Sequence, residues 1–520
     1  MNDTFHQLEP FTLFSDSLIW QINRDYYQEI GIEAWSKGKV PHQITSNSLV
    51  GKTYAELILA FRKDLAQKGQ TSETVYIIEL GAGHGRLAFH ILKHIEKLMS
   101  FEQEPLPPFC YILSDIAQKN LDFFKAHPQF KSYFDNGKLD FAFYDACNGK
   151  DIHLQHADVF ISTQQLNQPI IAIGNYFFDS IPNDLFQIKG DKLSVCSIAL
   201  ESKLNPSDVS SEDLPESLQL SYEHKQIDGS FYKLKILDDL LEHYRQSLKD
   251  SYLFFPERGI LCLQHLKSLS KKGMLLLSMD KGVHQLSKMD QKSQPEIITH
   301  GSFSLWVNYH ALHSFCEKTG GKALLPSYST FHVQVGCFLF LDNAKTYPST
   351  HLAYQRFVDD FGPDDYNSIK KFSYETFPTL TFNSLIAFLR LSSYDATFFL
   401  KALPQFRKLI KTVSYVERDR ISESLHKVWN FYFNIDERQD LALIIAGIFF
   451  DLAYYEDALV YYQFSTDQYG QEADTLHNKI LCYYQLRQDD LFKNELKEAK
   501  RIFPDSEIIT KLQALDLNAI

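Results

Sequence analysis

The sequence predicts an α/β domain built on a mainly parallel sheet, followed by an all-α domain. Short apolar runs alternate with helical periodicity from about residue 74 to residue 341, as is typical of strands and helices in a parallel sheet. After about residue 345 the strand patterns fade, and the periodicity is helical to the end. The 520 residues are also too many for one core, because single cores stop growing at about 250–300 residues.

Composition and charge exclude several classes of protein. Hydrophobic residues make up 44% of the chain and charged residues 22%, so disorder over most of its length is excluded. The net charge of −13 argues against nucleic acid as the main partner. The N-terminus lacks the pattern of a signal peptide, and the longest apolar run, Leu441–Phe450, is about half as long as a membrane span. We therefore expect a cytoplasmic protein without a membrane-spanning segment.

Cysteine usage points to a reducing compartment and to no metal cage. The seven cysteines are widely spaced, and none belongs to a Cys-x-x-Cys pair. This spacing indicates free thiols, with neither a disulfide framework nor a zinc site. We expect no metal ion in the protein.

The strand candidates follow one another through the first domain. They are residues 75–80, 111–113, 139–143, 170–173, 274–278, 322–325 and 331–341. Residues 1–70 look mostly helical, and residues from about 200 to 251 are rich in Ser, Asp, Glu and Lys and are interpreted as an insertion. Within it, Ser207–Glu216 predicts a loop. We place the first domain at residues 1–345 and the second at 346–520, with a linker around Asp342–Asp365.

The first strand candidate ends in a glycine-rich turn that carries the main functional signal. Glu79 is followed by Gly81, Gly83 and Gly85, and a helix follows the turn. Glycines at this spacing let the backbone turn sharply and approach a ligand, and the helix start supplies free N–H groups. The pattern differs from the dinucleotide fingerprint G-x-G-x-x-G, and no P-loop Lys-Ser or Lys-Thr follows it.

This turn resembles motif I of class I S-adenosylmethionine-dependent methyltransferases. The resemblance implies that the glycine loop passes under the methionine part of the cofactor and that Glu79 fixes the loop. It also implies that Asp115, after the second strand, accepts the ribose hydroxyls and that Asp145, after the third, meets the adenine amine. Either aspartate alone would be interpreted equally well as a solvated loop residue, but ligands in such sheets bind at the carboxyl ends of the strands. The expected cofactor-binding residues are Glu79, Gly81, Ala82, Gly83, Gly85, Asp115, Ile116, Asp145, Ala146 and Asn175.

The fourth strand end makes the resemblance more specific. Residues 172–183 are similar to the Asn-Glu-x-x-Asp-Ala-Leu-Pro signature of the MidA-like methyltransferases, with Asn175, Asp179 and Pro182 at matching positions. Stretches at 44–57, 273–282 and 303–309 resemble other segments of that family, and the resemblance covers roughly residues 8–341. It implies an arginine side chain of a protein as the methyl acceptor.

The acceptor side departs from the family pattern. Tyr176 stands where the family has Glu, and Lys281 where it has Tyr. Asp179 is the candidate that holds the acceptor and takes its proton, with Asn175 as a positioning residue; the alternative for Asp179 is a helix N-cap. Tyr176 and Phe178 are candidates for an aromatic acceptor pocket, with core packing as the alternative. Asp280 is a candidate for the acceptor site, with a structural role as the alternative.

The C-terminal domain shows a repeat with a period of 34 residues. Ala446–Phe450 and Ala458 in one unit correspond to Ile480–Tyr484 and Phe492 in the next. This pattern resembles tetratricopeptide repeats, in which small residues let antiparallel helices pack closely. The alternative is a generic helical bundle.

The sequence thus predicts a methyltransferase that uses S-adenosylmethionine and acts on a protein or peptide recruited by the helical repeats. Two other functions stay open: a scaffold that binds the cofactor but has lost transfer activity, which Tyr176 favours, and a small-molecule methyltransferase. The oligomeric state is open as well, a dimer included.

Overall fold

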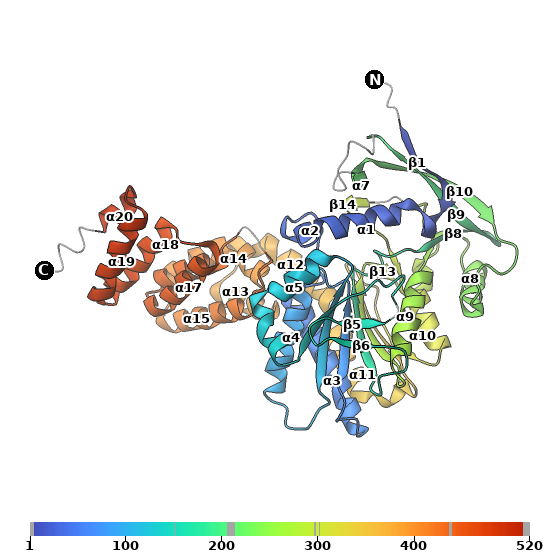
Figure 1. Cartoon of the computed structure of the whole chain (residues 1–520), viewed down its shortest axis with the longest axis horizontal. Coiled ribbons are helices and arrows are strands. Elements are labelled where there is room, and N and C mark those ends of the chain that lie inside the picture. Colours follow the sequence, from blue (N-terminus) through green and yellow to red (C-terminus); the bar gives the residue numbers. More distant parts are fainter. Residues whose placement is uncertain are drawn as a thin grey trace. The chain divides into compact units, whose positions relative to one another are not determined.

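The computed structural model of the chain describes residues 5–149, 151–204, 214–295, 298–300, 302–435 and 439–512 (Figure 1). The chain divides into two compact units, Met1–Ile369 and Lys370–Ile520. The boundary falls within α12 (Pro363–Thr376), C-terminal to the position after residue 345 that the sequence suggests. The reason lies in α11 (Pro348–Tyr354), whose first N–H groups, those of Ser349 and Thr350, donate to the Asp64 carboxylate on α3 (Ser48–Gln67). Residues after 345 therefore belong to the first unit.

Within the described residues, seven strands form the central sheet of the first unit. Its order is β17-β18-β12-β7-β2-β3-β4, and neighbours are parallel from β12 to β4. β18 runs antiparallel to both of its neighbours. This mixed α/β sheet has the arrangement of the class I methyltransferase fold, which confirms the predicted fold class. The strands are β2 (Val75–Leu80), β3 (Phe109–Asp115), β4 (Leu139–Phe143), β7 (Ile170–Asn175), β12 (Met274–Asp280), β17 (Lys322–Leu324) and β18 (Gln334–Phe340).

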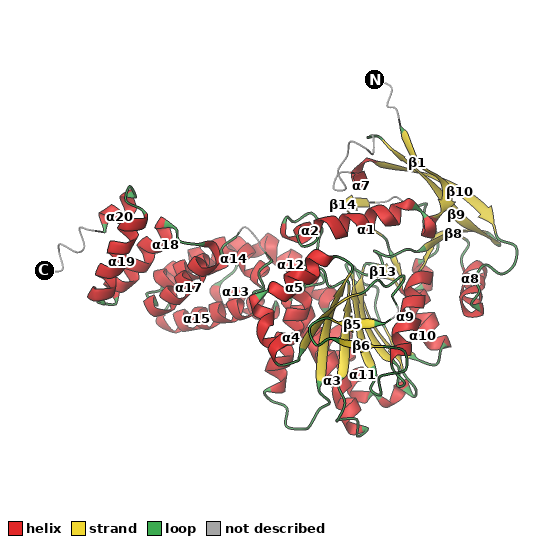
Figure 2. Ribbon diagram, in the orientation of Figure 1, coloured by secondary structure: helices red, strands yellow, loops and turns green. Residues whose placement is uncertain are grey.

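Helices cover both faces of this sheet (Figure 2). Every residue of β12 and β18 is buried, because a strand with helices on both sides has no face toward water. That is why these strands are continuous apolar runs in the sequence. The helices that cover the sheet include α3, α4 (Arg86–Met99), α5 (Gln118–Ala126), α6 (Lys131–Asp135), α9 (Glu257–Leu269), α10 (Tyr309–Lys318) and α11.

A second, antiparallel sheet pairs a strand near the N-terminus with strands from residues 184–255, and it corrects the expected start of the insertion. Its strands are β1 (His6–Leu13), β8 (Asp184–Lys189), β9 (Lys192–Ser202), β10 (Leu218–Gln226) and β11 (Asp250–Phe255). Residues 1–70 are mostly helical, as expected, with the addition of β1, which pairs with β9 far along the chain. The insertion begins with β8 rather than at about residue 200, and it includes α8 (Lys235–Ser247). The predicted loop Ser207–Glu216 lies mostly outside the described residues.

The described residues of the second unit are helical, as expected. The turns after three of its helices share one geometry, in which the N–H of Tyr394, Tyr454 or Gln488 donates to the carbonyl five residues earlier. Ala453 and Arg487, one residue before two of these donors, have φ of +64° and +54°. The predicted spacing of 34 residues therefore recurs in two turns, while the tetratricopeptide resemblance stays a prediction. The helices are α13 (Phe382–Leu391), α14 (Ala396–Leu409), α15 (Tyr415–Asn430), α16 (Leu441–Asp451), α17 (Tyr455–Tyr469), α18 (Ala473–Gln485), α19 (Asp489–Ile502) and α20 (Glu507–Lys511).

Two features are absent from the described residues. No helix in the described ranges combines the length and apolar character that a membrane crossing needs. Among the same residues, no cluster of three or more His, Cys, Asp or Glu side chains has an arrangement that could hold a metal ion.

Candidate functional site

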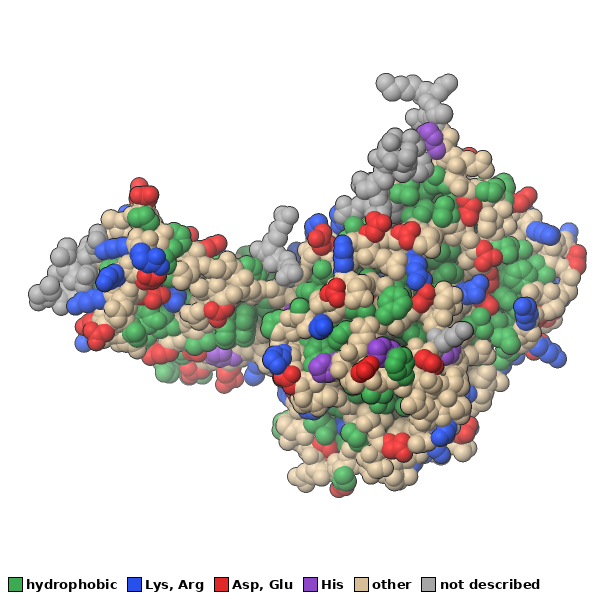
Figure 3. Space-filling model, in the orientation of Figure 1, with side chains coloured by type: hydrophobic (Ala, Val, Ile, Leu, Met, Phe, Trp, Pro, Cys, Tyr) green, Lys and Arg blue, Asp and Glu red, His purple; other side chains and the backbone are tan. Residues whose placement is uncertain are grey.

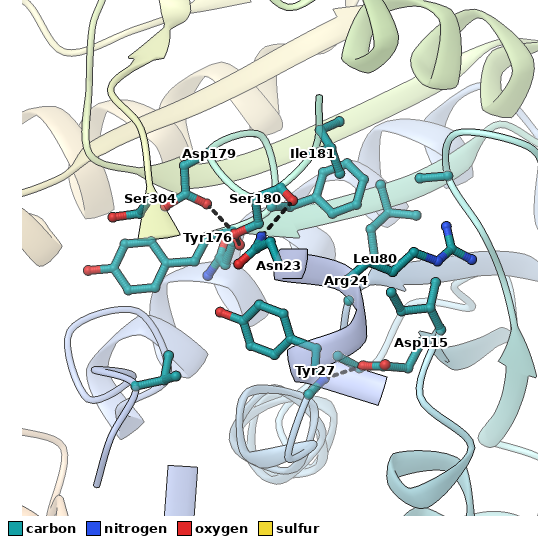
Figure 4. A pocket seen from close by; sticks show the side chains of 18 of the residues that line it. Asn23, Arg24, Tyr27, Leu80, Asp115, Tyr176, Asp179, Ser180, Ile181 and Ser304 are labelled. Carbon is teal, nitrogen blue, oxygen red and sulfur yellow. Dashed lines mark hydrogen bonds between the residues drawn. The ribbon is translucent and has the colours of Figure 1, made fainter. Parts of the chain in front are cut away.

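A cavity of about 390 Å³ opens at the carboxyl ends of the parallel strands. The glycine loop after β2 and the ends of β3, β4 and β7 form its floor, and residues of α1 (Leu18–Ile30), α2 (Glu33–Ser36) and the segment after α2 line it as well. Figure 4 separates two ends of this cavity: Arg24 and Asp115 lie at one, and Tyr176, Asp179 and Ser304 lie at the other. We call these the loop end and the acceptor end.

The glycine loop needs its glycines for backbone conformation and for space. Gly81, Gly83 and Gly85 have φ of +59°, +59° and +73°, a region that side chains other than glycine rarely adopt. A Cβ atom on Gly83 would lie 3.0 Å from two ring atoms of Trp35. Gly85 does not line the cavity; it is the residue before α4 and lies against Phe130.

Asp115 holds the glycine loop. Its Oδ2 accepts the N–H of Gly83 at 2.8 Å, and its Oδ1 accepts the N–H of Ala117 at 2.9 Å. The resemblance to motif I predicts that Glu79 fixes the loop. In the structure, Asp115 bonds to the loop, and the Glu79 carboxyl accepts the hydroxyl of Tyr111 at 2.8 Å. Burial raises the pKa of Glu79 to about 8. Burial also raises the pKa of Asp115.

Asp145 forms an ion pair across the loop end of the cavity. Its Oδ2 lies 2.8 Å from Nη1 of Arg24, which belongs to α1. The predicted neighbours Ile116 and Ala146 line the same cavity. Sequence reasoning missed Arg24 and the aromatic residues Tyr27 and Trp35, since nothing in the local sequence shows that these helices lie over the sheet edge.

Asn175 ends β7 with both of its polar groups engaged. Its Oδ1 accepts the hydroxyl of Tyr54 at 2.7 Å, and its Nδ2 donates to the carbonyl of Thr45 at 3.1 Å. Tyr54 lies on α3, so this residue ties the strand end to a neighbouring helix. In the sequence, Tyr54 stands out only as part of the stretch 44–57, which resembles a segment of the MidA-like family.

Asp179 lies at the acceptor end, in the turn between β7 and β8. It is 3% exposed, and its Oδ1 accepts the hydroxyl of Ser180 at 2.8 Å. Burial raises its pKa to about 6. No helix begins at Asp179, so the alternative of a helix N-cap is wrong. Asp280, the last residue of β12, is fully buried, and burial together with the charge of Asp179 raises its pKa well above its ordinary value.

Tyr176 adopts a strained backbone conformation beside these two carboxyls. Its φ is +47°, and its N–H donates to the carbonyl of Met279 on β12 at 3.0 Å. Its hydroxyl is buried and has no hydrogen-bond partner in the described part of the chain, whereas the carboxyl groups of Asp179 and Asp280 are hydrogen-bonded to each other. Burial and the charges of Asp280 and Asp179 raise the pKa of Tyr176. Polar atoms left without a partner in a buried place are costly, which makes this end of the cavity a candidate for ligand contact.

Two predicted acceptor residues differ in their position. Tyr176 lines the cavity, but the Phe178 ring lies in the hydrophobic core against Gly259. Its neighbour Phe177 lines the cavity instead. The expectation for Phe178 is therefore wrong, because in the turn after β7 adjacent side chains point in different directions. Asp280 lies behind Asp179 and is not part of the cavity lining.

The chain is similar to a protein family and to several solved structures. Residues 57–294 match the model of a family described as "Putative S-adenosyl-L-methionine-dependent methyltransferase". Similar solved structures include an uncharacterized protein from Burkholderia thailandensis, with 12% identity over 65% of this chain and 90% of that chain and a TM-score of 0.40. A "likely methyl transferase" from the same organism, bound to S-adenosylhomocysteine, has 12% identity, the same coverage and a TM-score of 0.39.

The magnesium protoporphyrin IX methyltransferase of Synechocystis PCC 6803, with bound S-adenosylhomocysteine, has 10% identity over 61% of this chain and 98% of that chain and a TM-score of 0.27. No curated protein matches this sequence. The family match and the class I fold around the glycine loop define the class of the protein, an S-adenosylmethionine-dependent methyltransferase. Its cofactor is therefore S-adenosylmethionine.

Proposed function

We propose that this enzyme methylates a protein side chain, the guanidinium group of an arginine. The observation that carries the proposal is the set of buried oxygen atoms at the acceptor end. They belong to Asp179 and Tyr176, which both line the cavity, and the Tyr176 hydroxyl has no partner within the described residues. A guanidinium has five N–H donors and no acceptor, so it suits a group of oxygens better than other side chains do.

For the cofactor, we propose that the loop end of the cavity holds it. The methionine part would lie over Gly81 and Gly83, the ribose hydroxyls at Asp115 and the adenine amine at Asp145, with Ile116 and Ala146 in contact with the base. All six residues line the cavity, and its volume falls in the range of about 300–1,000 Å³ that ligand sites have. When bound, S-adenosylmethionine supplies a methyl group on a positively charged sulfur.

Asp179 is the proposed proton acceptor of the reaction. Burial raises the pKa of both carboxyls, and the charge of Asp179 raises the pKa of Asp280 further, so Asp179 is the member of the pair that ionises first. A carboxylate in this place can hold the cationic acceptor and take the proton that its nitrogen gives up on methylation. Asn175 would act as a positioning residue, since Tyr54 and Thr45 fix its amide.

Recruitment of the protein substrate by the helical second unit is a further part of the proposal. Its support is the recurrence of similar helix turns, an arrangement that other repeat proteins use to build extended binding surfaces. If the acceptor were a small molecule, a chain that ends at Ile369 would keep full activity.

Calorimetry and a transfer assay test this function together. We expect wild-type protein to bind S-adenosylmethionine and Gly83→Asp to lose binding, because an aspartate side chain would collide with Trp35. Wild-type protein should then transfer a radiolabelled methyl group to arginine-containing peptides and not to the same peptides with lysine. Cofactor binding without any transfer to peptides or lysate proteins would instead support the scaffold, which the Tyr176 replacement favours.

A further inference from the structure

The segment that follows β12 borders the acceptor end of the cavity. It starts at Lys281, which lines the cavity, and runs through β13 (Gly282–Val283) to Gln285. We call residues 281–285 the rim segment. Two other segments of the first unit contact it, and each presents a large aromatic side chain to solvent.

Trp306 is the first of these aromatic residues. The next residue, Val307, donates its N–H to the carbonyl of Lys281 at 2.9 Å, and β16 (Val307–Asn308) pairs with β13. This pairing fixes the backbone of Trp306 beside the rim segment. Its side chain is nevertheless 60% exposed, with the ammonium group of Lys292 6.0 Å from the ring centre. Ser304, two residues earlier, lines the acceptor end.

Phe331 is the second, on the loop before β18. The Asp364 carboxylate accepts the N–H groups of Phe331, His332 and Val333, so the loop backbone is held firmly. The hydroxyl of Ser329 in the same loop donates to Gln285 at 2.7 Å, which joins the loop to the rim segment. The side chain of Phe331 is 83% exposed.

Two rigidly held, exposed aromatic residues beside a substrate site need an explanation. Exposed aromatic side chains at a fixed position lose little conformational entropy on binding, and residues of this kind dominate the energy of protein interfaces. Their neighbours Val307 and Ser329 bond to the rim segment, and neither aromatic residue belongs to the hydrophobic core clusters of this unit.

We propose that Trp306 and Phe331 form a docking surface for the protein substrate, and that they bind apolar side chains that flank the methylated residue. This inference rests on the proposed function, because its occupant is the protein acceptor. We choose the acceptor as occupant because both residues are tied to cavity-lining positions. Trp306 follows Ser304 by two residues, and the loop of Phe331 is hydrogen-bonded to the rim segment that begins at Lys281. A segment with its arginine in the cavity would place its neighbouring residues over the rim segment.

Defined peptides test the proposal. One peptide series carries a central arginine flanked by leucine and phenylalanine, and a matched series carries serine at the flanking positions. Binding is measured by fluorescence anisotropy of labelled peptides in the presence of S-adenosylhomocysteine, and transfer is measured with radiolabelled S-adenosylmethionine. The proteins are the full chain, the double variant Trp306→Ala with Phe331→Ala, and Phe101→Ala. Phe101 is a matched control: it is 77% exposed and lies in the turn between α4 and β3, before the amino end of that strand, whereas the cavity lies at the carboxyl ends of the strands.

We expect the wild type to bind the apolar-flanked peptides about tenfold more tightly than the serine-flanked ones, a typical effect of interface aromatics. The double variant should lose this preference, and Phe101→Ala should keep it. Equal affinity of the wild type for both series, with methylation of both, would overturn the docking surface and leave the proposed function intact. If the wild type binds the cofactor but methylates no arginine peptide, the proposed function fails and the inference with it.

Discussion

Tyr176 combines backbone strain with a buried hydroxyl that has no partner in the described residues. A non-glycine residue at positive φ costs about 1–3 kcal/mol, and such strain gathers at functional sites. A buried hydroxyl without a partner adds a desolvation cost. Neither cost stabilises the fold, and we therefore propose that Tyr176 contacts the methyl acceptor.

Removal of this hydroxyl should separate stability from activity. We expect Tyr176→Phe to raise the free energy of unfolding by about 1 kcal/mol, because it deletes an unsatisfied polar group. The same change should lower kcat/KM for arginine peptides by about tenfold or more, through the loss of one contact to the acceptor. Urea unfolding and the transfer assay measure the two effects, and a parallel loss of both would show that Tyr176 has only a structural role.

The proposed proton acceptor gives a second prediction at this scale. Asp179→Asn keeps the size of the side chain but removes the charge that a cationic acceptor needs. We expect kcat/KM to fall by about 10²–10⁴, the usual contribution of a general base, while the Kd for S-adenosylmethionine stays unchanged. An unchanged transfer rate would exclude Asp179 from the reaction.

The buried imidazole of His94 should make the free energy of unfolding depend on pH. Burial lowers its pKa to about 3, whereas an unfolded histidine titrates near about 6.5. Between these values the unfolded chain binds a proton that the folded chain does not, so the contribution of this residue is complete above about pH 6.5 and is lost as the pH falls. In His94→Gln the slope of unfolding free energy against pH, between about pH 6 and 4.5, should decrease by up to about 1.4 kcal/mol per pH unit. Identical slopes in the two proteins would contradict this.

Among the elements, α11 shows how a contact between segments far apart along the chain decides a domain boundary. The Asp64 carboxylate accepts hydrogen bonds from the first turn of this helix, and Tyr354 at its end donates its hydroxyl to the carbonyl of Val335 on β18. In the sequence, Pro348, Gly362 and Pro363 make this segment look like a linker. Its contacts with α3 and β18 make it part of the first unit.

The contact through Asp64 should be measurable. We expect Asp64→Ala to lower the free energy of unfolding of the first unit by about 1–2 kcal/mol, the typical cost of losing a helix cap. Amide exchange at Ser349 and Thr350 should speed up at the same time. Asp135→Ala is the control, since Asp135 is exposed and paired only with Lys131, and its effect should stay below about 1 kcal/mol.

At the scale of the whole molecule, two compact units suggest a division between chemistry and recruitment. The cavity, the glycine loop and the acceptor end all belong to Met1–Ile369. The face of the molecule in Figure 3 has acidic and basic side chains interspersed, with apolar ones between them. This mixture favours local contacts, such as those proposed for the rim segment, over binding through one large charged surface.

Truncation tests this division. A chain that ends at Ile369 should bind S-adenosylmethionine with the affinity of the full chain, because it keeps every residue of the cavity and all of α11. A chain that ends at residue 345 should be far less stable, because it leaves Asp64 buried without its partners. Calorimetry and thermal unfolding of both chains measure this. If the shorter chain binds as well as the longer one, α11 is not needed for the first unit.

The sequence by itself determined the sheet, the glycine loop and the acidic strand ends. Long apolar runs reveal buried strands, and the glycines at 81, 83 and 85 show where the backbone must turn, because both signals are local. The tertiary structure decided what local patterns do not contain. It pairs β1 with β9, lays Arg24 over Asp145, turns Phe178 into the core and gives Asp115 rather than Glu79 to the loop. Each of these depends on contacts between residues distant along the chain or on the direction of one side chain in a turn, and neither leaves a periodic trace in the sequence.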